Sequence, residues 1–207
     1  MSGSGCAIPS TQQALWIVLH GQEPSELFDR FECIKSLTDG AFILDDAMET
    51  FTYAGGRDLT GYEDGTANPS PEESPSVALV ESGEGLAGSS FVAVQRWEHD
   101  LARFCSHSQT ERDFTIGRSI ETNEELDDAP TSAHVKRTAQ EEFEPEAFMV
   151  RRSMPWATAQ TQGLEFIAYG SSLDPFEQVL RRMAGLDDGI TDALFTFSRP
   201  VTGGYYW

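Results

Sequence analysis

Apolar positions along this chain fall into two kinds of segment, short extended runs and longer runs with helical spacing. Residues 13–20 (QALWIVLH) are apolar at nearly every position, which is typical of a buried strand. In residues 23–38 the apolar side chains recur every three or four positions, which predicts a helix. Ser25 is its expected N-cap, and Asp39-Gly40 is expected to end it.

The rest of the chain continues this alternation. Further extended segments are predicted at residues 41–54, 78–80, 88–97, 148–152, 164–169 and 202–207, and helices at residues 98–108, 111–117 and 175–184. Residues 61–75 are predicted to be an irregular loop, residues 123–137 an acidic loop with a short helix, and residues 192–197 a helix or a strand edge. Because strands follow one another directly as well as alternating with helices, the pattern favours an α+β fold with antiparallel sheets.

The charge and composition of the chain argue against some classes of binding partner. The chain has 14 Lys and Arg against 34 Asp and Glu, a formal net charge of −20. Such a charge argues against nucleic acid or an anionic membrane as partner. No run approaches the roughly 18 consecutive apolar residues of a membrane span, and the first residues lack the basic and apolar parts of a secretion signal. We therefore expect a soluble protein.

The cysteines point to a reducing compartment. Cys6, Cys33 and Cys105 are an odd number, and no two of them form a CxxC pair. This pattern favours free thiols over a disulfide scaffold or a cysteine metal site, and so a cytoplasmic location.

Four segments carry a resemblance to a known family. They are residues 61–69 (GYEDGTANP), 90–101 (SFVAVQRWEHDL), 116–138 (IGRS…NEE…SAHVKRT) and 150–156 (VRRSMPW), and residues 197–207 fit as well. The GxxDG motif alone is weak evidence for a family, because Asp-Gly turns are common. All of these segments in this order resemble the dye-decolorizing peroxidases, a family of haem enzymes, and most closely their cytosolic bacterial branch.

The resemblance implies a fold and a division into domains. The family has two ferredoxin-like halves of the dimeric α+β barrel type, with antiparallel sheets packed against helices and haem held mainly by the second half. The similarity begins near residues 9–12, so the first half is expected to be incomplete. We expect a partial N-terminal half at residues 1–60, the GxxDG loop and linker at 61–76, and the haem-binding half at 77–207. Since no CxxCH is present, the haem b would be bound non-covalently.

The resemblance also implies three central site residues. His134 would be the axial ligand of the haem iron, although a lone histidine in an acidic loop is more often exposed; His99, expected on a helix face, is the rival ligand. Asp64 would move a proton between the peroxide oxygens, and as an isolated residue it would be an ordinary turn aspartate. Arg151 would stabilise negative charge on the peroxide. Arg152 is expected to point to the opposite face of the strand and to form a surface ion pair.

Further residues are expected around the haem. Asp192 would hydrogen-bond His134, unless it is only a helix N-terminal aspartate. Arg118 would meet a haem propionate. Leu164 and Phe166 would form a wall of the pocket, a position compatible with ordinary strand core. The remaining predicted cofactor contacts are Gly65, Thr66 and Ser153.

The function implied is reduction of hydrogen peroxide coupled to one-electron oxidation of dyes, phenols or similar small aromatic reductants. One alternative is a haem-handling, deferrochelatase-like protein without peroxidase turnover, and another is an inactive fragment. An open sheet edge at the predicted strand of residues 13–20 would pair with another chain, which predicts a homo-oligomer.

Overall fold

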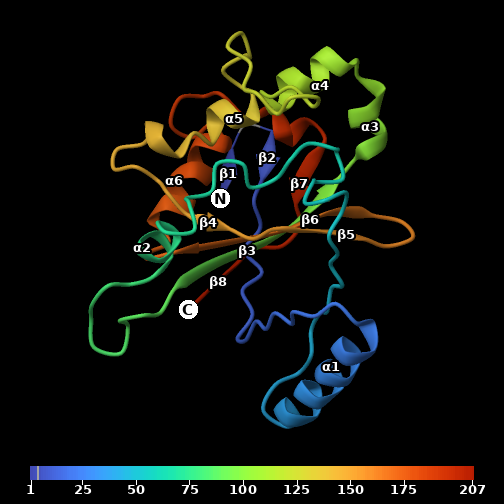
Figure 1. Ribbon diagram of the computed structural model, residues 1–207, viewed down its shortest axis with the longest axis vertical. Helices are drawn as coiled ribbons and strands as arrows, with labels where there is room; N and C mark the ends of the chain where they lie inside the picture. The colour runs from blue at the N-terminus through green and yellow to red at the C-terminus, as the bar shows by residue number, and fades with distance from the viewer. Residues whose placement is uncertain (4) are drawn as a thin grey trace. The chain divides into compact units, whose positions relative to one another are not determined.

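The computed structural model describes residues 1–3 and 5–207, and it divides the chain into two compact units. The larger unit comprises Met1–Gln12 and Thr50–Trp207, and the smaller comprises Gln13–Glu49. Figure 1 traces the elements along the chain. None of the helices in the described residues is long and apolar enough to span a membrane.

The larger unit is built on an antiparallel sheet. Four strands lie in the order β4 (Val150–Arg151), β6 (Gln162–Gly170), β3 (Phe91–His99) and β7 (Ser198–Pro200), while β5 (Met154–Ala157) pairs with β6 and β8 (Gly204–Tyr206) with β3. A two-stranded ladder joins β1 (Ser2–Gly3) to β2 (Cys6–Ala7). Every strand pair is antiparallel, which confirms the expected α+β class.

Helices gather on one face of this sheet (Figure 1). They are α3 (Leu101–Ser106), α4 (Gln109–Ile116), α5 (His134–Arg137) and α6 (Asp174–Met183), while the short elements α2 (Ser74–Ala78), η1 (Gln140–Glu142) and η2 (Ala193–Thr196) lie in the connections. Helix α6 buries four apolar side chains at spacings of three and four residues, so that a single stripe faces the sheet. They are Phe176, Val179, Leu180 and Met183. They pack with Ala93, Trp97 and Ala168 of the sheet in the main core.

The smaller unit contains one helix, α1 (Pro24–Thr38), and otherwise irregular chain. Glu23 precedes the helix, Pro24 occupies its first turn, and no side chain caps it. The helix predicted at residues 23–38 is confirmed, but the expected N-cap Ser25 is wrong because it lies inside the first turn. No residue of this unit is buried.

The strands predicted at residues 13–20, 41–54 and 78–80 are wrong. The first two form no ladder with any described residue, and the last is the end of α2 and the residues after it. Apolar composition alone therefore misled the prediction, since a strand also needs a neighbour for its backbone N–H and C=O groups. The open strand edge on which the oligomer prediction rested is not present.

The helix predicted at residues 98–108 begins later, and His99 is not on a helix face. Strand β3 continues through His99 because Glu98 and His99 pair with Arg199 and Ser198 of β7. The helix starts only after Asp100, whose carboxylate accepts the Arg103 N–H at 2.9 Å as an N-cap.

Candidate functional site

Strands β3 and β6 form the floor of a cleft in the larger unit. Gln95, Trp97 and His99 are alternate residues of β3, so their side chains point to the same face. Directly across the ladder, Phe166 pairs with Gln95 and Leu164 with Trp97. All five side chains line the cleft, which gives it a largely apolar base.

Two walls rise from this floor. One is the apolar stripe of α6, and the other is the loop that carries GxxDG. The loop contributes Asp58, Thr60, Tyr62, Glu63 and Asp64, and the helix Phe176, Val179, Leu180 and Met183. The cleft has a volume of about 140 Å³.

His134 enters the cleft from the first position of α5. Its Nδ1 lies 2.8 Å from Oδ2 of Asp192. Asp192 is 1% exposed, and its other oxygen accepts the Leu194 N–H at 2.8 Å. Because the Asp192 carboxylate accepts a hydrogen bond from Nδ1, the ring proton stays on Nδ1 and Nε2 keeps its lone pair. Among the described residues Nε2 has no hydrogen-bond partner, so it is the atom available to a ligand.

Helix α5 is short, and an ion pair between its buried Arg137 and the partly exposed Asp188 fixes it in place. The Arg137 guanidinium donates from Nη1 and Nη2 to both carboxylate oxygens of Asp188, at 2.7 and 2.8 Å, and Nη2 also donates to the Arg182 carbonyl. Arg137 is 5% exposed. These bonds lower the pKa of Asp188. Because they start three residues after His134, they also fix the direction in which the imidazole points.

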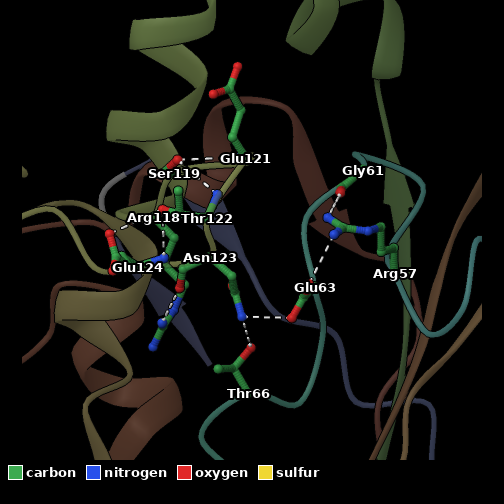
Figure 2. Close-up of polar contacts among 10 residues, drawn as sticks. All are labelled: Arg57, Gly61, Glu63, Thr66, Arg118, Ser119, Glu121, Thr122, Asn123 and Glu124. Atoms are coloured by element: carbon green, nitrogen blue, oxygen red, sulfur yellow. Dashed lines mark hydrogen bonds and ion pairs between the residues drawn. The ribbon is translucent and has the colours of Figure 1, made fainter.

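The loop that carries Asp64 is braced on both sides (Figure 2). Arg57 donates to the Gly61 carbonyl at 2.7 Å and to the Glu63 carboxylate at 2.9 Å. From a separate turn, Asn123 donates to Glu63 at 2.7 Å and to Thr66 at 3.3 Å (Figure 2). Asn123 has a left-handed backbone (φ 59°), a conformation that asparagine tolerates better than most residues.

Arg151 is held beside this loop by a pair of bonds to Asn68. The Asn68 side chain accepts the Arg151 N–H at 2.8 Å and donates to the Arg151 carbonyl at 3.0 Å. Burial lowers the pKa of Arg151, the negative charge of Asp64 raises it, and the charge of Arg118 lowers it. Its Nε atom is buried without a hydrogen-bond partner. A buried charged group with an unused donor is costly, which is typical of a site built for a ligand.

The structure brings together most of the residues that the sequence singled out. Asp64, Arg151, His134, Leu164 and Phe166 all line the one cleft, and Asp192 lies behind His134. Four other predicted contacts do not line it: Gly65, Thr66, Arg118 and Ser153.

Those four residues have other surroundings. Arg118 donates to the Asn123 carbonyl at 2.8 Å and pairs with Glu125. Thr66 accepts from Asn123, and Gly65 forms the turn after Asp64 with φ 73°. The Ser153 hydroxyl is buried without a partner.

Sequence reasoning missed Asp58, and it placed His99, the rival ligand, on a helix face instead of at the end of a strand that lines the cleft. His99 Nε2 lies 3.2 Å from Asp58 Oδ1, and its Nδ1 lies 2.6 Å from Ser198 Oγ. Burial raises the pKa of Asp58, but the hydrogen bonds from His99 and Thr60 outweigh it and lower the pKa overall. A signal was available, because His99 continues the alternation of Gln95 and Trp97 along one strand face.

The chemistry available in this cleft is specific. It offers one unpaired imidazole nitrogen, three carboxylates and the guanidinium of Arg151 over a largely apolar floor. Among the described residues no group of three or more His, Cys, Asp or Glu side chains could hold a bare metal ion. A single imidazole suits instead a metal whose other ligands come from a macrocycle.

Comparison with known proteins shows which family has a matching sequence. The model of the family "Dyp-type peroxidase, C-terminal" matches residues 55–207. The chain belongs to this family. The matched region contains every residue that lines the cleft.

Individual proteins similar to this chain carry names of the same family. The dye-decolorizing peroxidase of Mycobacterium tuberculosis is 35% identical over 181 residues, which cover 84% of this chain and 54% of the relative. A heme complex of a DypB variant from Rhodococcus jostii has a TM-score of 0.91 at 29% identity, covering 99% of this chain and 68% of that one. The encapsulated DyP-type peroxidase from Mycobacterium smegmatis has the same TM-score and identity, covering 99% and 69%. The chain spans about half the length of the curated relatives it matches.

Proposed function

We propose that this chain is a haem peroxidase that reduces hydrogen peroxide and oxidises small aromatic donors, such as dyes and phenols, by one-electron steps. The observation that carries the proposal is the His134–Asp192 pair, which leaves His134 Nε2 free in a cleft that also contains Asp64 and Arg151. The names of the relatives point to the same activity.

The residues of the cleft fit a non-covalent haem b. His134 would hold the iron through Nε2, and Leu164, Phe166 and the α6 stripe would contact the porphyrin face. Arg151 is buried with an unpaired Nε, which a peroxide or another anionic ligand could satisfy. When bound, the haem supplies the redox chemistry that stores the oxidising equivalents of the peroxide.

The protein side of the mechanism is acid–base and electrostatic. Asp64 takes a proton from one peroxide oxygen and delivers it to the other, which leaves as water. The Arg151 guanidinium stabilises the negative charge that develops as the O–O bond breaks, and it stays charged because arginine is not deprotonated in proteins. Asp192 keeps the Nδ1 proton in place and makes the His134 imidazole a stronger electron donor.

We further propose that residues 77–207 form the haem-binding half, with the GxxDG loop supplied by residues 61–76. Both segments contribute to the cleft: Glu63 and Asp64 from the loop, and the two floor strands and α6 from the later segment. Gly65, Thr66 and Arg118 would then act around the haem indirectly, through the loop and turn in which they lie.

We also propose a cytoplasmic location and a homo-oligomeric assembly. All three cysteines are free, which suits a reducing compartment. Large apolar side chains are exposed on the smaller unit, and such exposure is typical of association surfaces.

The deciding experiment is a titration of the purified chain with hemin, followed by stoichiometric hydrogen peroxide, monitored by absorbance. A saturable Soret band that changes on peroxide addition is expected. Asp64→Asn and Arg151→Leu should each keep the Soret band but react with peroxide about 100-fold more slowly. His134→Ala should lose or scramble hemin binding, because no other cleft side chain presents an unpaired imidazole nitrogen.

Matched controls separate these effects from general damage. Asp127→Asn, Arg152→Leu and His107→Ala change exposed residues of the same types and should leave both readouts unchanged. Specific hemin binding without any peroxide reaction would support a haem-handling protein instead. If His134→Ala keeps a histidine-ligated spectrum, the ligand assignment is wrong.

A further inference from the structure

His99 is a buried histidine with partners on both ring nitrogens. It is the last residue of β3 and is 5% exposed. Nδ1 contacts the Ser198 hydroxyl at 2.6 Å, and Nε2 contacts Asp58 Oδ1 at 3.2 Å. Asp58 continues the string, because its Oδ2 accepts the hydroxyl of Thr60. Four polar side chains are thus connected through the interior, and the peroxide mechanism above uses none of them.

The two ends of this string open into different cavities. Asp58, Thr60 and His99 line the cleft proposed to hold the haem. His99 and Ser198 also line a second cleft, of about 610 Å³, between the end of β3, the start of α3 and β7. Its charged side chains are two acids and two bases, Glu98, Asp100, Arg103 and Arg199. His99 therefore lies between an open, polar cleft and the largely apolar cleft proposed to hold the haem.

The hydrogen-bond pattern suits proton transfer from Ser198 through His99 to Asp58. Asp58 is ionised at neutral pH, since its pKa is lowered. It therefore accepts a proton from His99 Nε2, so Nδ1 carries the lone pair and accepts from Ser198. A proton arriving at Nδ1 through the Ser198 hydroxyl gives a transient imidazolium, which releases the Nε2 proton to Asp58. Each atom needed for one complete transfer is in contact with the next.

We propose that Ser198, His99 and Asp58 form a proton inlet that carries protons from the second cleft into the haem cleft. The proposal rests on the proposed function, because reduction of hydrogen peroxide to two waters consumes two protons and two electrons. The aromatic donor supplies the electrons.

A hydrolase interpretation of the same three residue types does not hold. In serine hydrolases the hydroxyl must be accessible to attack a carbonyl carbon. Ser198 is 2% exposed, so its hydroxyl presents almost no accessible surface to a substrate carbonyl. The hydroxyl is placed to donate a hydrogen bond and not to act as a nucleophile.

The first test needs no haem. In the ¹⁵N-histidine-labelled chain, exchange of the His99 ring N–H with water is measured by NMR. Ser198→Ala should slow this exchange about tenfold or more, because the donor to Nδ1 is lost while the bond to Asp58 is kept. Ser198→Thr restores a hydroxyl and should restore the exchange. Ser106→Ala, which removes an exposed hydroxyl elsewhere, should have no effect.

The second test uses the haem-loaded chain in stopped flow. Ser198→Ala and His99→Gln should slow the donor-dependent half of the cycle about tenfold and leave the first reaction with peroxide unchanged. His99→Gln keeps an amide donor toward Asp58 but cannot accept and release a proton. His107→Gln is the matched control.

The outcomes are separable. Unchanged or faster ring exchange in Ser198→Ala overturns the proton inlet, whether or not the chain is a peroxidase. Equal slowing of both halves of the cycle also overturns it, and indicates that His99 only supports the loop. Slowed ring exchange in a chain that never reacts with peroxide would keep the inlet and reject the proposed function.

Discussion

His134 can offer only one ring nitrogen to a ligand, because Asp192 holds the other at 2.8 Å. Asp192 is in turn fully engaged, since its second oxygen accepts the Leu194 N–H and its own N–H donates to the Met183 carbonyl. The position of the imidazole is thus set by one buried aspartate, whose carboxylate takes part in two hydrogen bonds and whose backbone N–H forms a third. The strength of the metal bond depends on this carboxylate as much as on the histidine.

At this scale we predict that Asp192→Asn lowers hemin affinity 10- to 100-fold. The amide can donate toward Nδ1, which favours the tautomer with the proton on Nε2 and removes the lone pair from the cleft. Affinity would be measured by Soret titration, and the iron–histidine stretch by resonance Raman. Asp187→Asn, on an exposed ion pair with Arg181, is the control. An unchanged stretch would show that Asp192 does not tune His134.

Single residues also show where prediction from sequence ends. Asp64, Arg151 and His134 were singled out only because whole segments resembled a family; each alone is equally compatible with a surface role. Asp58 was missed, and His99 was placed on a helix face, for a physical reason. Their partners, including Ser198, come from three separate segments, and a contact across 99 residues leaves no local pattern.

Two elements meet at Asn68. Its side chain forms two bonds with the backbone of Arg151 at the end of β4, so the loop after GxxDG is attached to the strand that carries the guanidinium. This attachment holds Asp64 and Arg151 in the same cleft although 83 residues separate Asn68 from Arg151. The relative position of acid and cation is therefore a property of the loop–strand contact.

We predict that Asn68→Ala destabilises the fold by about 1–3 kcal/mol, because two partly buried bonds are lost and the Arg151 N–H is left unpaired. The peroxide reaction should slow as well, since the acid and the cation are no longer held together. Chemical denaturation and stopped flow would measure the two effects. Asn68→Asp keeps the acceptor, so its stability and its rate of reaction with peroxide should lie between those of the wild type and those of Asn68→Ala. Wild-type stability in Asn68→Ala would show that the loop is fixed elsewhere.

Elements with a strong internal pattern were predictable. The α6 stripe satisfies helical spacing, and β6 follows an apolar run of strand length, so both were expected near their observed bounds. The run at residues 13–20 has the same composition as a strand but no neighbouring strand among the described residues. Pairing is a tertiary property, and apolar content does not report it.

Over the whole molecule, the net charge and the exposed apolar side chains have opposite effects on self-association. A net charge of −20 keeps copies apart, with a range set by ionic strength. The smaller unit nevertheless exposes Phe28, Leu37 and Ile43 at 63%, 78% and 95%, which favours association. The balance between the two sets how strongly copies associate.

We predict that the chain self-associates, and more so as salt screens the negative charge. Size-exclusion chromatography with light scattering at low and high salt would measure the mass. Leu37→Ser combined with Ile43→Ser should shift the population toward monomer. Leu86→Ser, at an exposed position of the larger unit, should not. A monomer at every salt concentration would reject the oligomer.

The long sequence separations within the cleft have a consequence for the order of events during folding. Its contacts join residues 58, 83 and 99 positions apart, and closing such loops costs entropy before any contact compensates for it. No short piece of the chain holds even half of the site. The cofactor site therefore forms only after β3 has paired with β6 and β7. A chain still being synthesised on the ribosome would have no site that could bind a haem.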